Sequence, residues 1–94
     1  MDKTEARQLA LDRITELRQM SYAELRDRFL EQRQCDEVRA VSGTVYQVET
    51  EGFWDDRKES HLRILVYVDD GGWAAFSPVG DGFIVAPHGS FVGE

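Results

Sequence analysis

The chain has 94 residues and a formal net charge of −7, with 31% charged and 41% hydrophobic residues. This length and composition predict one globular domain, 1–94, with a modest core, and exclude a disordered chain. No apolar run approaches the roughly 18 residues that a membrane span requires. The polar N-terminal segment lacks the apolar stretch of a signal peptide. A single cysteine, Cys35, excludes an internal disulfide and favours a reducing, cytoplasmic location.

The acidity is concentrated in the second part of the chain. Residues 1–37 hold seven basic against nine acidic residues, whereas residues 38–94 hold four against nine. An acidic surface repels nucleic-acid phosphates and anionic lipids, and no local basic patch offsets it. We therefore expect neither a nucleic-acid nor a membrane partner. Two interpretations of the charge remain open: it keeps a small protein soluble, or it attracts a basic protein partner.

The first helix is predicted over residues 2–20. Asp2 and Glu5 have the spacing of a capping box, in which each end of the motif satisfies a free backbone donor. Apolar residues then recur on one continuous stripe of the helix, and charged residues occupy the rest of its circumference. This pattern indicates an amphipathic helix with one buried side.

A second capping box, Ser21 and Glu24, begins another helix that is expected to end near Arg33. Almost no loop separates the two helices, so we expect them to meet at a large angle. Residues 34–37 are predicted to be a linker.

From Val38 the hydrophobic period changes from helical spacing to two, which indicates strands. The first strand is predicted over about 40–50, with a bulge near Gly43, and a long polar connection follows it. The central strand is predicted over 61–68, because this is the most apolar and β-branched run in the chain. The remaining predicted strands are Trp73–Ser77, Phe83–Ala86 and a short Ser90–Val92, with a turn at Val79–Gly82.

The element order predicts an α+β fold. Two N-terminal helices, within residues 1–37, pack on one face of a four- to five-stranded antiparallel meander formed by residues 38–94. The central strand is apolar on both faces, yet the helices can cover only one of them. We assign the helices to the face that carries Leu62, Ile64, Val66 and Val68.

The second face of the sheet then carries Leu65, Tyr67 and Phe76, which we predict to be a partner-binding surface. Three ways of covering it are open. The segment 83–92 folds back over it, the face pairs with itself in a homodimer, or it receives another protein.

Several residues are candidates for chemistry. Consecutive hairpin turns alternate between the ends of a meander, so Asp69, Asp70 and His88 are predicted to share one end of the sheet. This group is either a cation-binding cluster or a set of exposed loop residues. Asp55, Asp56 and Asp81 are predicted at the opposite end. Cys35, His61 and His88 lack the spacing of a nucleophile with its base or of a zinc site. We therefore expect no catalytic residue, no metal and no cofactor.

The leading functional hypothesis is a small acidic cytoplasmic protein, without enzymatic activity, that acts by protein–protein contact as an inhibitor, an immunity-type protein or an adaptor. Its partner is a basic protein or a second copy of the chain. The alternative is a small-ligand-binding module or a small enzyme with an aromatic pocket between helices and sheet. That pocket would use Tyr46, Trp54, Trp73 or His61.

Overall fold

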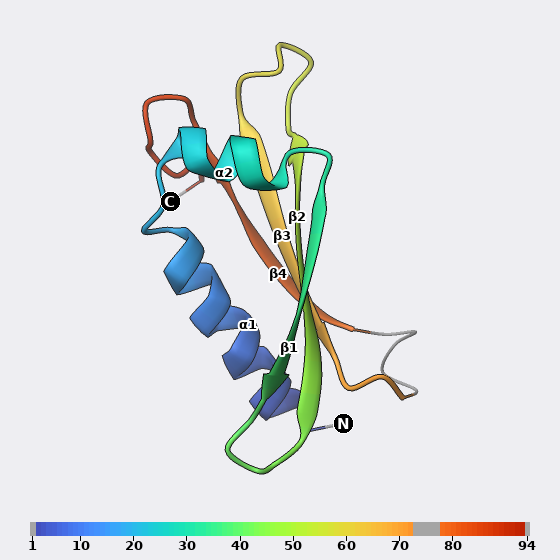
Figure 1. Ribbon diagram of the computed structural model, residues 1–94. Helices are drawn as coiled ribbons and strands as arrows, with labels where there is room; N and C mark the ends of the chain where they lie inside the picture. The colour runs from blue at the N-terminus through green and yellow to red at the C-terminus, as the bar shows by residue number, and fades with distance from the viewer. Residues whose placement is uncertain (1, 73–77, 94) are drawn as a thin grey trace.

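The chain folds into two layers, with both helices packed on one face of an antiparallel sheet (Figure 1). The computed structural model describes residues 2–72 and 78–93. Within these residues the strands lie side by side in chain order, so that each one pairs with its sequence neighbour. The predicted α+β meander is therefore confirmed. The elements are α1 (Lys3–Leu17), α2 (Tyr22–Phe29), β1 (Arg33–Arg39), β2 (Val45–Trp54), β3 (Leu62–Asp69) and β4 (Val79–Val85).

Both predicted helix caps are present. The Glu5 amide donates to Asp2 Oδ1 at 3.0 Å, and the Glu24 amide donates to Ser21 Oγ at 3.1 Å. Each cap satisfies a donor that the first helical turn would otherwise leave unpaired. Figure 1 shows α1 and α2 at the wide angle expected from the short break between them.

Helix α2 ends at Phe29, earlier than the predicted end near Arg33. Glu31 has a positive φ of 55°, which turns the chain out of the helix, and its amide donates to the Gly52 carbonyl at 2.9 Å. A Cβ at Gly52 would lie 3.2 Å from the Phe29 backbone. Glycine at this position therefore lets the end of α2 lie directly against β2.

The structure corrects the prediction for residues 34–37, which belong to strand β1 rather than to a linker. The sheet thus begins at Arg33. Strand β1 has no alternating pattern of apolar residues. Val38 is the one apolar side chain of this strand that packs against the core. Asp36 also faces the helices, where Arg13 of α1 binds it at 2.7 Å. Pairing with β2, and not local hydrophobicity, makes this segment a strand.

Residues 40–44 form the turn between β1 and β2, so β2 begins at Val45 and not near Ala40. Gly43, predicted at a bulge, lies in this turn with a φ of +92°, and its amide donates to the Ala40 carbonyl at 2.9 Å. A positive φ is a conformation that glycine adopts without steric cost. Strand β2 then continues to Trp54. The sequence predicts that this strand ends at about Thr50 and that a polar connection follows, so the strand is longer at this end than predicted.

Strand β4 also differs from its prediction. The predicted turn at residues 79–82 forms the first half of this strand. The predicted strand 73–77 lies outside the described residues. The predicted strand 90–92 is reduced to a bridge between Phe91 and Val85, and the Val92 amide donates to the Ile84 carbonyl at 2.9 Å. This tail lies along the outer edge of β4.

The core lies between the helices and the sheet. Helix α1 contacts β3 and β4, whereas α2 contacts β2 and β3. The face of β3 predicted to lie under the helices is the buried one. No helix in the described part of the chain is long and apolar enough to cross a membrane. The buried cluster comprises Ala6, Ala10, Ile14, Leu17, Leu25, Phe29, Tyr46, Val48, Leu62, Ile64, Val66, Val68, Val79, Phe83 and Val85.

Candidate functional site

The face of the sheet that points away from the helices is the surface on which the sequence predicts a partner. We call it the open face. Its residues alternate along each strand with the core residues, and the strand register places them in cross-strand rows. The open face comprises Arg33, Cys35, Glu37 and Arg39 of β1, Val45, Gln47, Glu49, Glu51 and Phe53 of β2, Arg63, Leu65, Tyr67 and Asp69 of β3, and Gly80, Gly82 and Ile84 of β4.

Leu65 and Tyr67 lie on this face as predicted, but they are half-buried. Leu65 pairs with Gly82 and Tyr67 with Gly80 across β3 and β4. A Cβ on Gly80 would lie 3.0 Å from Tyr67 Cδ1, and one on Gly82 would lie 2.9 Å from Leu65 Cδ2. Both side chains therefore lie flat over the glycines of β4, where a larger residue would hold them off. The third predicted member, Phe76, lies outside the described residues.

Carboxylates border this apolar strip. Glu49 lies opposite Tyr67, and Glu51 lies opposite Leu65, across β2 and β3. Arg33 on β1 reaches both carboxylates, at 3.5 Å from Glu49 and 4.0 Å from Glu51. The sheet surface here is a shallow hollow of about 690 Å³. It is lined by Arg33, Cys35, Gln47, Glu49, Glu51, Tyr67, Asp69 and Pro78.

The sequence prediction omitted Glu49, Glu51 and Cys35 from this surface. The signal for the two glutamates is present, because they alternate with the buried Val48 and Thr50. The polar sequence around Cys35 predicts a linker, whereas this residue lies in β1 with its thiol exposed. Its Sγ is 3.5 Å from the amide oxygen of Gln47.

The C-terminal segment does not cover the open face, which was one of the three predicted alternatives. Residues 83–85 belong to β4 itself. Phe91 packs edge-on against the core residue Phe83, with ring centroids 5.6 Å apart. The guanidinium of Arg18, just after α1, lies 4.0 Å from the centre of the Phe91 ring. These contacts hold the Phe91 ring on the helix side of the sheet edge, whereas Val92 and Gly93 lie at the border of the open face and line a hollow with Leu65 and Ile84.

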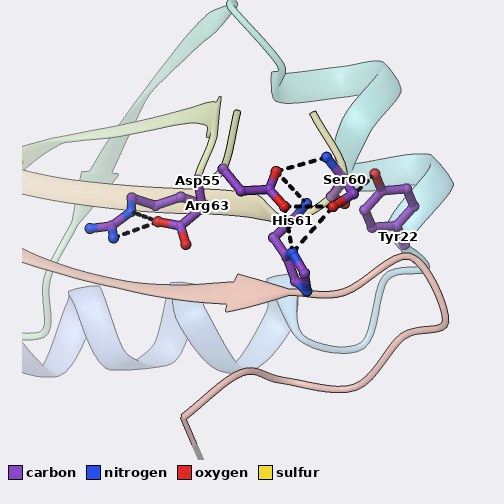
Figure 2. Close-up of polar contacts among 6 residues, drawn as sticks. Tyr22, Asp55, Ser60, His61 and Arg63 are labelled. Atoms are coloured by element: carbon purple, nitrogen blue, oxygen red, sulfur yellow. Dashed lines mark hydrogen bonds and ion pairs between the residues drawn. The ribbon is translucent and has the colours of Figure 1, made fainter. Parts of the chain in front are cut away.

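A compact polar network closes the loop between β2 and β3 (Figure 2). Asp56 Oδ1 accepts from the amides of Ser60 and His61 at 2.9 and 3.2 Å, and its Oδ2 accepts from the Ser60 hydroxyl at 2.6 Å. The His61 side chain also hydrogen-bonds Asp56, and this bond has the largest effect on the carboxyl group. Together with the bonds to Ser60 and the His61 amide, it holds the pKa of Asp56 well below its usual range. Tyr22 of α2 donates to the Ser60 carbonyl at 2.8 Å, which ties the loop to the helical layer.

Asp56, Ser60 and His61 are the residue types of a hydrolytic triad, but their geometry is different. In a triad one imidazole nitrogen bonds the carboxylate and the other bonds the hydroxyl. Here Nδ1 of His61 meets both partners, at 2.8 Å from Asp56 Oδ2 and 3.2 Å from Ser60 Oγ. The Ser60 hydroxyl is itself directed at the carboxylate. The network therefore closes a loop and does not activate a nucleophile.

The predicted grouping of Asp69, Asp70 and His88 is wrong. Strand β3 ends at Asp69, while β4 runs back beside it and ends at Val85, which pairs with Leu62 at the start of β3. His88 follows Val85 and so lies at the opposite end of the sheet from the two aspartates. The prediction failed because it placed a turn at residues 79–82, which belong to β4 and pair with β3.

Each member of that predicted group has a local role in its own turn. The two aspartates accept hydrogen bonds from the glycine amides that follow them, at 2.8 and 3.1 Å. The imidazole of His88 lies 2.6 Å from a serine hydroxyl two residues away. Such contacts are typical of loop tips. The pairs are Asp69 with Gly71, Asp70 with Gly72, and His88 with Ser90.

The aromatic residues of the predicted pocket do not converge. Tyr46 is buried in the core, where its hydroxyl donates to Glu5 Oε1 at 2.9 Å, and burial raises its pKa to about 12. Trp54 closes the other end of β2, roughly 26 Å away at about 3.3 Å per residue. Trp73 lies outside the described residues.

In the range that the structure describes, no group of three or more His, Cys, Asp and Glu side chains is arranged to hold a metal ion. Comparisons with protein-family models, with curated proteins and with solved structures found no match. The open face is therefore the feature of this chain from which a function is inferred.

Proposed function

We propose that this protein acts by binding another protein through the open face of its sheet, and that the contacted surface of the partner is basic. The observation that carries the proposal is the strip formed by Leu65 and Tyr67, which lies flat over the glycines of β4 and is bordered by Glu49 and Glu51. A half-buried apolar strip with a polar rim is the composition of a protein-binding surface.

The charges at the border of the strip indicate that the contacting surface of the partner is basic. On this face Arg63 is held by Asp55, with N–O distances of 2.6 and 2.9 Å, and Arg33 reaches Glu49 and Glu51 only at 3.5 to 4.0 Å. The chain as a whole carries −7. A basic surface would therefore be attracted over a long range and would form charge-assisted contacts at the rim. An inhibitor, an immunity-type protein or an adaptor in the cytoplasm is the class of protein that fits these properties.

The proposal is tested by affinity capture with the full chain and two open-face variants, Leu65→Asp and Glu49→Lys. The matched control is Leu11→Asp, because Leu11 is 42% exposed on α1 and lies away from the sheet. We expect the wild type and the control to retain the same basic protein, and both open-face variants to lose it. Retention should also weaken as salt is raised. A capture pattern that is unchanged by the open-face variants, or no retained protein at all, contradicts the proposal.

A further inference from the structure

The two edges of the sheet are not equivalent. The outer edge of β4 is bordered by the chain's own tail, where Val92 bonds Ile84 and Phe91 bridges Val85. The outer edge of β1 pairs with no strand in the described ranges. Such an edge presents unpaired backbone donors and acceptors, and it is a template on which another strand can add.

The register of β1 identifies which backbone groups point outward. The Ala40 amide donates to the Thr44 carbonyl at 2.9 Å, and the same register continues without a bulge to the pair of Arg33 with Glu51. In an antiparallel pair, residues that bond the neighbouring strand alternate with residues whose backbone groups point away. Even-numbered residues of β1 therefore bond β2, and odd-numbered residues face outward. The outward set is Arg33, Cys35, Glu37 and Arg39.

The charge order of this outward set is complementary to itself in one antiparallel register. With a two-fold axis at Cys35, Arg33 of each copy lies opposite Glu37 of the other. An axis at Asp36 would place Asp36 against itself and Arg33 against Arg39, and an axis at Glu37 would place two carboxylates together. Registers centred nearer either end overlap fewer residues. Opposite charges directly across a strand pair are favourable and like charges are not, so the register at Cys35 is selected.

We propose that the chain forms a homodimer by antiparallel pairing of two β1 strands about a two-fold axis at Cys35. The groups that this pairing uses are available. The Arg33 side chain is 61% exposed, and Glu37 is exposed without an ion-pair partner in the described part of the chain. Helix α1 packs mainly under β3 and β4 and reaches β1 through the Arg13–Asp36 ion pair, and the odd-numbered residues of β1 are exposed, so this edge is accessible.

The pairing has a consequence for the surface of the assembly. A two-fold axis perpendicular to the sheet keeps both helical layers on one side and both open faces on the other. The two hollows beside Tyr67 then form one continuous surface, with the two Cys35 thiols adjacent at its centre. The dimer goes beyond the proposed partner binding and does not rest on it, since it uses the edge of the sheet and leaves the open face accessible.

The decisive experiment is a charge swap, read by light scattering and sedimentation on the full chain over a range of concentrations. Glu37→Arg opposes two arginines at each contact, and Arg33→Glu opposes two glutamates. We expect each single variant to weaken self-association at least about tenfold. An equimolar mixture of the two variants should restore it, because both contacts of the mixed dimer again pair an arginine with a glutamate.

Matched controls are Arg57→Glu and Glu59→Arg, which make the same charge changes in the exposed loop between β2 and β3. These variants should associate like the wild type. Circular dichroism and melting curves confirm that each variant is folded. If Arg33→Glu does not fold, Glu37→Arg with Glu37→Gln still tests the contact, since the neutral variant should weaken the dimer less. A wild type that stays monomeric at hundreds of micromolar overturns the proposal, and so does a dimer that ignores both charge reversals.

The register is tested separately with the native thiol. A nitroxide spin label on Cys35 points onto the open face and leaves the β1 backbone free. Labels on two paired copies should lie next to each other and broaden each other's spectrum. Mixing the labelled chain with an excess of unlabelled chain should remove the broadening. A dimer without this broadening would place the contact elsewhere.

Discussion

The two faces of β3 share one backbone but differ in environment. Leu62, Ile64, Val66 and Val68 point to the helices, and each is 0% exposed. Between them on the open face Arg63 is exposed, and Leu65 and Tyr67 are half-buried. The difference arises because both helices lie on one side of the sheet. It shows that one apolar strand can place most of its stabilising contacts on one face while the other face stays partly exposed.

The glycines of β4 complete this contrast. On the face toward the helices, the neighbours of β3 are large side chains such as Phe83, which fill the core. On the open face, Gly80 and Gly82 let Tyr67 and Leu65 lie flat. The apolar strip is therefore partly shielded from water, and this limits the exposed apolar area of the protein.

The largest expected effect is the loss of a core side chain from the helix-facing side of β3. Ile64→Ala should lower the free energy of unfolding by about 2–5 kcal/mol, because it removes buried methyl groups and leaves a cavity. Leu65→Ala, one residue along on the open face, should cost about 1 kcal/mol or less. Urea unfolding of both variants measures the difference. Equal losses would show that the two faces do not differ as described.

A smaller effect is expected where β4 approaches β3. Gly82→Ala would place a Cβ 2.5 Å from the Ile64 carbonyl oxygen and 2.9 Å from Leu65 Cδ2. The backbone must shift to accept it, so we expect a loss of about 1–3 kcal/mol. Gly72→Ala is the matched control, because the nearest atom to its new Cβ, an Asp70 carboxylate oxygen, is 3.4 Å away. Thermal melts should show a lower Tm for Gly82→Ala alone.

Thr50 is a polar residue on the helix-facing side of the sheet, where it is 0% exposed. Within residues 2–72 and 78–93, its buried Oγ1 has no hydrogen-bond partner. Thr50→Val keeps the shape and removes the unpaired hydroxyl, so it should stabilise the protein by about 1 kcal/mol. Thr44→Val in the exposed turn should change little by comparison. A less stable Thr50→Val variant would indicate a partner for the hydroxyl.

The smallest effect at neutral pH concerns Tyr46 on the same buried side. Burial, and then the hydrogen bond to Glu5, raise its pKa from 10.0 to about 12. The raised pKa contributes stability below pH 10, and this contribution is lost as the pH rises from 10 through 12. Phenolate absorbance should show a tyrosine ionising near pH 12. This step should be absent from Tyr46→Phe, and a wild type without it would contradict this assignment.

The features predicted correctly from the sequence are those that depend on near neighbours in the chain. The caps at Asp2 and Ser21 each need a residue three positions away. The burial of alternate residues in β3 follows from a period of two. The position of Tyr67 on the open face follows from the same period.

The features that were missed depend on strand pairing. Residues 34–37 are polar and resemble a linker, but β2 supplies their hydrogen bonds and Arg13 neutralises Asp36. Gly80 and Gly82 indicate a turn when taken locally, although they are the places where β3 side chains lie on β4. The position of His88 was wrong for the same reason, because the predicted turn at residues 79–82 is part of β4 and pairs with β3.

Local sequence is sufficient to define the starts of the two capped helices and the central strand β3. Hydrogen-bonded caps and hydrophobic periods act over a few residues, so they can be recognised without the fold. Three other features exist only in the folded chain: β1 is an edge strand, β4 begins at Val79, and particular loops share an end of the sheet. They come from backbone pairing between segments distant in the chain, for which side-chain pattern carries little local signal.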